Sequence, residues 1–192
     1  MTTLMDIQTQ SPPVEETELA RQAVSDAEAF AELYRRHVTR VYRYHIAHTG
    51  SVKDAEDLTS QTFLAALEGI RSFRGDAPFA AWLMGIASRR RALFFRGRRR
   101  EVPLEAVEYY PNPAPPTDKA AALRLQIASV ARALRRISPD RAEAVILHFF
   151  GGLKHSEAAR VLGKTEAAVK MLVSRGLQDL REQTSLALEV EL

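Results

Sequence analysis

Apolar residues along this 192-residue chain recur at spacings of three and four, the period of a helix with one buried face. One such stripe covers residues 30–42, and another begins at Phe79 and continues through Trp82 and Ile86. Nowhere do β-branched and polar residues alternate for long enough to indicate strands. The pattern therefore predicts an all-α protein.

The C-terminal part has its own succession of helices. An apolar stripe covers residues 123–137, and Ser138 followed by Pro139 is typical of the start of a new helix. After a glycine pair, a short helix over 155–162, a tight turn at Gly163 and a longer helix over 166–181 are expected. This order is the pattern of a helix-turn-helix, although an ordinary helical hairpin would show the same spacing.

Proline divides these two parts of the chain. Five prolines fall within residues 102–117, which excludes a helix there and favours an extended tether. The sequence thus predicts two small helical domains joined by a flexible Pro-rich linker, the second being a four-helix domain with a helix-turn-helix. The expected boundaries are a disordered N-terminal tail at 1–24, the first domain at 25–100, an acidic linker at 101–120, the second domain at 121–183 and a C-terminal tail at 184–192.

The amino-acid composition indicates the cellular compartment of the protein. The sequence has no cysteine, which excludes disulfides, thiolate zinc sites and cysteine nucleophiles. No apolar run approaches the roughly 18 residues that span a bilayer, and the N-terminus does not have the pattern of a secretory signal. We therefore expect a cytoplasmic protein with no direct membrane insertion.

Charge is segregated along the chain. Residues 25–100 carry 14 basic and 8 acidic side chains and residues 121–183 carry 11 and 6, whereas the linker at 101–120 is acidic. Two basic blocks suit the phosphate backbone of nucleic acid, although solvated surfaces would account for the charges as well.

Two basic clusters suggest where nucleic acid binds. Seven arginines in residues 88–100 lie beside Phe94 and Phe95, a combination that suits phosphates and unstacked bases. A solvated basic face or the disordered end of a domain is the alternative. In the helix-turn-helix, Lys164, Lys170 and Arg175 lie where a second helix would meet DNA.

The sequence gives little indication of a catalytic site or a metal site. His37, His45 and His48 could in principle gather around a metal ion, but no acid completes the set nearby, and structural roles account for them better. No Ser/His/Asp or paired-carboxylate arrangement stands out. We expect no enzyme, no catalytic residue, no metal or other cofactor and no small-molecule substrate.

Three motifs in order resemble a known family. They are AEDLTSQTFLAAL at 55–67, FRGDAPFAAWLMGIA at 73–87 and GGLKHSEAARVLGKTEAAVKMLVSRGLQDLRE at 151–182. Together they resemble the extracytoplasmic-function (ECF) sigma factors of bacterial RNA polymerase, within the sigma-70 family. The likeness extends over about residues 25–183.

The resemblance implies three sets of site residues. The helix at 54–67 would bind core polymerase through Asp54, Asp57, Leu58, Gln61, Thr62 and Phe63. The loop at 71–79 and the helix after it would recognise and melt the promoter −10 element through Ser72, Phe73, Arg74, Trp82, Arg89, Arg90 and Arg96. The −35 element would be read by His148, Lys164, Thr165, Glu166, Ala168, Lys170, Met171, Ser174 and Arg175.

The resemblance also implies the partners and the activity. Core RNA polymerase, through its β′ clamp and β flap, and promoter DNA would be bound, and an anti-sigma factor is a possible further partner. The function would be promoter-specific initiation of transcription with DNA melting. The alternatives are a free-standing helix-turn-helix regulator, which should bind DNA as a dimer, and an RNA-binding adaptor associated with polymerase.

Overall fold

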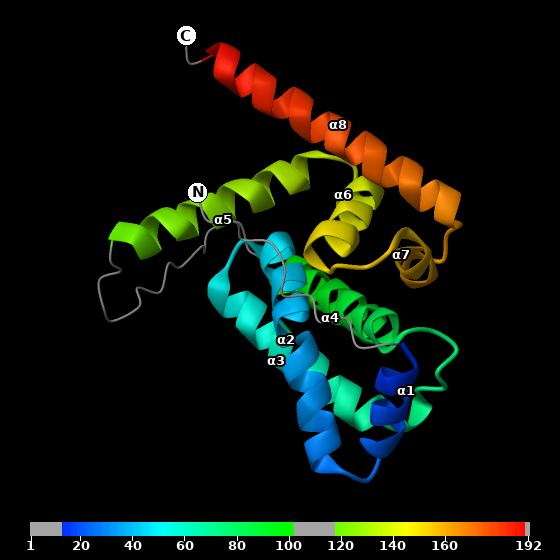
Figure 1. Ribbon diagram of the computed structural model, residues 1–192. Helices are drawn as coiled ribbons and strands as arrows, with labels where there is room; N and C mark the ends of the chain where they lie inside the picture. The colour runs from blue at the N-terminus through cyan, green and yellow to red at the C-terminus, as the bar shows by residue number, and fades with distance from the viewer. Residues whose placement is uncertain (1–12, 102–117, 191–192) are drawn as a thin grey trace, which may run out of the picture.

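The computed structural model describes residues 13–101 and 118–190, and all regular structure in those ranges is helical (Figure 1). The α-helices are α1 (Pro13–Gln22), α2 (Ala27–Thr49), α3 (Val52–Gly69), α4 (Phe79–Glu101), α5 (Asp118–Arg136), α6 (Pro139–Val145), α7 (His155–Leu162) and α8 (Glu166–Val190). A 3-10 turn at Ile70–Ser72 follows α3, and a π-helical turn at Ile146–Phe150 continues α6. The all-α prediction is confirmed.

Local sequence signals set the helix ends in the first half, α1 to α4. The Asp26 side chain accepts a hydrogen bond from the Glu28 amide at 2.9 Å and caps α2, which Gly50 ends in a left-handed conformation at φ 66°. The Ser51 hydroxyl accepts from the Asp54 amide and caps α3. Large apolar side chains of α2, α3 and α4 then meet in one core: Leu33, Val41, Tyr44, Phe63, Phe79, Leu83 and Met84.

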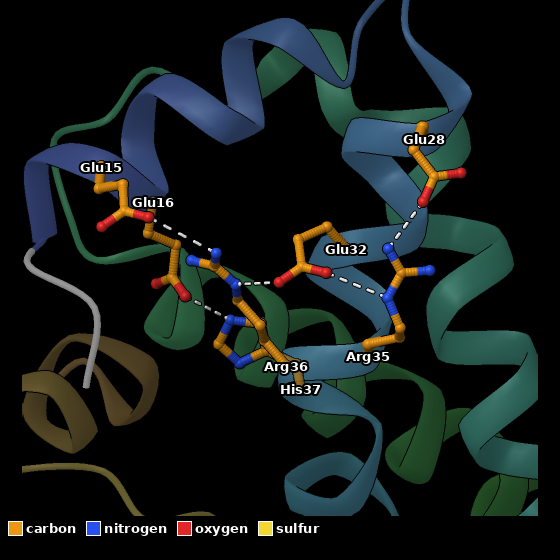
Figure 2. Close-up of polar contacts among 7 residues, drawn as sticks. All are labelled: Glu15, Glu16, Glu28, Glu32, Arg35, Arg36 and His37. Carbon is orange, nitrogen blue, oxygen red and sulfur yellow. Dashed lines mark hydrogen bonds and ion pairs between the residues drawn. The ribbon is translucent and has the colours of Figure 1, made fainter. Parts of the chain in front are cut away.

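The expected disordered tail at 1–24 is wrong for most of its described residues, because Pro13–Gln22 forms α1. Ala20 on α1 and Ala23 just after it are buried in the core. Figure 2 shows how acidic α1 meets basic α2: Glu16 lies 2.7 Å from Nε2 of His37, and Glu15 lies 3.5 Å from Arg36. Small apolar residues and opposite charges thus attach a segment whose composition alone suggests a solvated tail.

The second half, α5 to α8, contains the predicted helix-turn-helix. Helix α7 ends at Gly163, whose φ of 62° makes the turn, and the Thr165 hydroxyl accepts from the Ala168 amide at the start of α8. Helices α6 and α8 approach closely at Gly176, where a Cβ atom would lie 2.8 Å from Val145. Helix α8 continues to Val190, beyond the expected domain end at 183.

The two halves pack on each other and share one hydrophobic core. Helix α2 contacts α5 and the π-helical turn, and α4 contacts α7, which lies beside the start of α4 in Figure 1. At one point a Cβ atom on Gly50 would be only 3.0 Å from the Cβ of Ala131. The prolines of the expected linker lie outside the described residues, so its flexibility stays a prediction. The sequence signals gave no indication that the halves would be in contact.

Candidate polymerase and nucleic-acid interfaces

The face of α3 expected to bind polymerase is only partly exposed. Asp57 and Gln61 are exposed, whereas Leu58, Thr62 and Phe63 are buried. The Thr62 hydroxyl donates to the Leu58 carbonyl at 2.7 Å and lies 2.9 Å from Nε2 of His45, so it belongs to the internal hydrogen bonding of the first half. These three residues support the helix from inside, and the prediction that they contact a partner directly does not fit this surface.

Two exposed leucines on α3 were missed by the sequence prediction. Leu64 is 57% exposed and Leu67 is 47% exposed, and Leu64 lies seven residues after Asp57 on the same side of the helix. The sequence could have indicated them, because both leucines fall outside the apolar stripe that an amphipathic helix buries. Asp54, at the other end, pairs with Arg98 at 3.0 Å. Acidic, polar and apolar groups thus share one exposed face, which suits a protein partner better than DNA.

The loop expected to melt DNA leads into an aromatic cluster. The ring of Phe73 is half-buried and lies 5.4 Å from the ring of Phe79 and 5.5 Å from that of Trp82. Ser72 donates to the Gly69 carbonyl, while Arg74 is exposed. The loop also touches α1, because a Cβ atom on Gly75 would be 2.9 Å from Cγ2 of Thr17. Phe73 therefore has a packing role as well as a partly exposed aromatic face.

The arginines of α4 point in different directions. Arg89 and Arg96 are exposed and Arg90 is half-buried, so these three can meet a ligand as predicted. Arg91 instead turns inward, with Nη2 3.2 Å from the Glu143 carboxylate of α6. Arg98 lies over the ring of Phe94 at 5.0 Å. The basic cluster thus divides into a surface set and a set used in packing.

Helix α7 lies against the side of α4 that carries Trp82 and Arg89. A cleft of about 300 Å³ between the two helices is lined by both residues and by Arg160 and Val161 of α7. The Arg160 guanidinium also donates to the backbone carbonyl of Asp76 in the loop before α4. The predicted −10 surface is therefore partly covered by the second half of the chain.

The predicted −35 surface is open by contrast. All the predicted residues on α8 and in the turn before it are exposed: Lys164, Thr165, Glu166, Ala168, Lys170, Met171, Ser174 and Arg175. Thr165 has a capping role in addition. Lys170 pairs with Glu166 at 2.9 Å, and Lys164 pairs with Asp140 at 3.0 Å.

His148 stands apart from the other predicted −35 residues because it is half-buried. Its Nδ1 lies 2.8 Å from the Leu153 carbonyl, and its ring stacks on that of His155 at 4.3 Å. Partial burial, with His148 and Lys170 nearby, lowers the pKa of His155. His155, at the start of α7, is a residue that the sequence prediction missed.

The three histidines weighed as metal ligands have separate partners. His37 pairs with Glu16, His45 with Thr62, and Nε2 of His48 lies 3.2 Å from the Glu143 carboxylate. Within 13–101 and 118–190, no cluster of three metal-ligating side chains occurs. Over the same residues, no helix is both long and apolar enough to cross a bilayer.

Comparisons with known proteins match the two parts of the chain separately. A family profile described as sigma-70 region 2 matches residues 33–101, and one described as sigma-70, region 4 matches residues 127–180. The chain is 37% identical to the ECF RNA polymerase sigma factor BldN of Streptomyces coelicolor, over 83% of this chain but only 62% of that protein. It is 33% identical to the ECF RNA polymerase sigma factor SigM of Mycobacterium tuberculosis, covering 82% of this chain and 78% of SigM.

Solved structures show the same likeness. The structure of CnrH in complex with the cytosolic domain of CnrY matches with a TM-score of 0.71 and 25% identity, over 89% of this chain and 97% of CnrH. The sigma factor RpoE in complex with the anti-sigma factor NepR, from Bartonella quintana, matches with a TM-score of 0.62 and 25% identity, over 82% of this chain and 98% of RpoE.

Proposed function

Since the chain belongs to the sigma-70 family, as an ECF sigma factor of RNA polymerase, we propose that it uses three separate exposed surfaces in transcription initiation. The α3 face binds core polymerase, the start of α4 and its preceding loop handle the −10 element, and α8 reads the −35 element. The observation that carries this proposal is that one chain has two separate basic surfaces. The first lies in the part that matches region 2 and the second in the part that matches region 4.

Polymerase binding is assigned to the exposed groups of α3. Asp57 and Gln61 supply polar contacts, and Leu64 and Leu67 supply apolar area that water otherwise covers. The buried residues of the motif act only by holding this face in shape. The β′ clamp is the proposed partner of α3, and the β flap is the proposed partner of the second half.

The −35 assignment rests on geometry. In a helix-turn-helix the second helix enters the major groove, and here that helix presents Lys170, Ser174 and Arg175 to solvent. On the −10 side, Phe73 and Trp82 offer partly exposed aromatic faces beside Arg74 and Arg89. Aromatic faces next to arginines suit bases that have left the stack.

Further features of the proposal follow from this role. The chain contributes binding energy and catalyses no reaction of its own, and it works in the cytoplasm beside the polymerase. CnrH and RpoE were each solved in complex with another protein, CnrY and the anti-sigma factor NepR. By analogy, an anti-sigma protein is a proposed partner here.

Transcription in vitro, with purified core polymerase, this chain and a library of promoter fragments, tests the proposal. We expect transcripts only from templates that carry both a −35 and a −10 sequence, and only when the chain is added. Tight, specific duplex binding by a free dimer would instead indicate a helix-turn-helix regulator. A preference for single-stranded RNA regardless of promoter sequence would indicate an adaptor.

Asp57→Arg tests the polymerase surface. Reversing an exposed charge at a desolvated contact should weaken core binding by on the order of a few kcal/mol, measured by competition with the parent chain. Glu18→Arg is the matched control, because it reverses an exposed acid on α1, away from the proposed face. If folded Asp57→Arg competes as well as the parent, the assignment of α3 is wrong.

A further inference from the structure

A buried carboxylate joins the two halves of the chain. Glu143 projects from α6, and Oε1 accepts hydrogen bonds from the Tyr44 hydroxyl at 2.6 Å and the Ser88 hydroxyl at 3.3 Å. Its Oε2 lies 3.2 Å from Nε2 of His48 and 3.2 Å from Nη2 of Arg91. All four partners belong to α2 and α4, so the first half forms a donor socket, consisting of Tyr44, His48, Ser88 and Arg91, for one acid of the second half.

Glu143 keeps its negative charge in this socket although it is only 6% exposed. Burial opposes ionisation, but His48, Arg91 and Tyr44 outweigh it and lower the pKa of the carboxyl to about 2. Burial and the adjacent Glu143 raise the pKa of the Tyr44 hydroxyl. The contact therefore combines a charged acceptor with donors that are largely out of water.

The socket is not a tightly sealed contact. Nε of Arg91 is buried without a hydrogen-bond partner among the described atoms, and Oε2 of Glu143 faces His48 and Arg91 without hydrogen-bond geometry. Beside it, a cavity of about 780 Å³ separates the end of α4 from α5 and α6, lined in part by Phe95, Leu134 and Ile137. Because desolvation largely offsets the attraction in a buried ion pair, this arrangement is easier to separate than an apolar one of the same size.

The same packing covers part of the −10 surface. With Glu143 in its socket, α7 lies beside Trp82 and Arg89, and Arg160 bonds the loop at Asp76. The Arg40 side chain of α2 packs against the loop before α7, 3.6 Å from a Cβ position on Gly152. An opened DNA strand could reach this side of α4 only after α7 moves away.

We propose that Glu143 and its donor socket form an intramolecular latch that holds the second half over the −10 surface until polymerase or promoter DNA separates the halves. The effect on transcription rests on the proposed function, whereas the latch itself is a property of the free chain. For every partner that needs the open form, the apparent affinity is the intrinsic affinity multiplied by the fraction of molecules that are open. The polar socket keeps that reduction modest, since separation returns its groups to water.

The 192-residue chain permits a direct measurement, because it has no cysteine of its own. Cysteines placed at exposed Thr39 on α2 and Gln178 on α8 would carry a dye pair for single-molecule energy transfer. Glu143→Gln keeps an acceptor for Tyr44 but removes the charge that faces Arg91. We expect it to raise the open-to-closed ratio by about tenfold or more, since it leaves the half-buried guanidinium of Arg91 without its counter-charge. Glu18→Gln, which removes an exposed carboxylate on α1, should leave the ratio unchanged.

A double variant separates a latch from a general loss of structure. Arg91→Met alone should also open the chain, but Arg91→Met combined with Glu143→Gln should close it again relative to either single variant, because no unpaired charge is left buried. Purely additive opening would overturn the proposal, as would a parent energy-transfer distribution that Glu143→Gln does not shift.

Transcription by the unlabelled variants then distinguishes the two proposals. If Glu143→Gln opens the chain and forms open promoter complexes several-fold faster than the parent, the latch controls access to the −10 surface. If it opens the chain without changing that rate, occlusion of the −10 surface is wrong. If neither parent nor variant supports transcription, the proposed function is wrong, and the energy-transfer result on the latch still stands.

Discussion

The two predicted DNA-binding surfaces differ in how far the fold uses their residues. On α8, Lys170, Ser174 and Arg175 are exposed, and none of them belongs to the hydrophobic core. In the loop before α4 and at its start, Phe73 and Trp82 pack with Phe79, and Trp82 also lines the cleft beside α7. We therefore expect substitutions on the predicted −35 surface to leave the fold unchanged, whereas the predicted −10 surface is part of the packing of the first half.

Acidification should give the largest effect and should sharpen this contrast, because the first half buries a histidine. Burial, with nearby His48 and Arg91, lowers the pKa of His45 to about 3, against 6.5 when exposed. Below pH 6.5 the unfolded chain takes up a proton that the folded chain does not, so stability falls as pH drops from about 6.5 toward 3. The slope from this group is at most about 1.4 kcal/mol per pH unit.

Urea unfolding between pH 7.5 and 5 measures how the free energy of unfolding changes with pH. Titration of Glu143 would affect stability only at lower pH. His45→Gln retains a donor toward Thr62 but cannot titrate, so its slope should be flatter than that of the parent. An identical slope in the two proteins would mean that another group is responsible.

The next largest effect tests whether the aromatic face of Phe73 acts on DNA or only in packing. Stacking is worth about 1–3 kcal/mol per base, so Phe73→Ala should slow promoter melting while −35 recognition is retained. Permanganate footprinting reports the melted region directly. A template that is already melted should restore much of the transcription.

Phe73→Leu is the matched control for this variant, because it keeps most of the apolar volume and removes the ring. If Phe73→Leu melts the promoter at the parental rate, packing is the role of Phe73. The −10 surface would then owe its contacts to Trp82 and the arginines.

Truncation on the open −35 surface should act without loss of folding stability. Lys170→Ala or Arg175→Ala should cost roughly 1–3 kcal/mol on the preferred −35 sequence if the residue contacts a base. A phosphate contact would instead weaken all sequences alike and lower the salt slope by about 1. Arg181→Ala, also exposed on α8 but beyond the predicted residues, is the control. If neither variant changes promoter occupancy, α8 is not the reading helix.

The smallest effect concerns the exposed ion pair between Lys164 and Asp140, which links the turn of the helix-turn-helix to α6 at 3.0 Å. Exposed pairs typically contribute less than about 1 kcal/mol, so Asp140→Asn should change thermal stability little. A loss well above that value, measured by thermal unfolding, would show that the −35 surface is also tied into the fold.

Periodicity and capping were enough to predict the helices of the second half. The short helix expected at 155–162 is α7, His155–Leu162, because its flanking glycines and Thr165 are local signals. In the first half, the helix expected at 54–67 lies within α3, Val52–Gly69. Apolar periodicity and helix caps involve residues that are close in sequence, so they can be recognised without knowing the tertiary structure.

The placement of site residues was less predictable. Thr62 and Asp57 belong to one motif, but the first turns toward His45 and the second toward solvent, and only the packing of α2 on α3 decides this. Helix α1 was missed because it is short and acidic, and its attachment depends on basic residues of α2. Glu143 was missed for the same reason, because its partners are 52 to 99 positions away in sequence.

The socket around Glu143 also limits how this chain can be recombined with its relatives. Exchanging the C-terminal half for that of another sigma factor is a simple way to change the promoter that is read. A donor sequence without an acid aligned to residue 143 would leave Arg91 facing the junction without a counter-charge. Chimeras of this protein therefore need position 143 matched to positions 44, 48, 88 and 91, so these five sites have to remain compatible although they lie on both sides of the gap between the two family profiles.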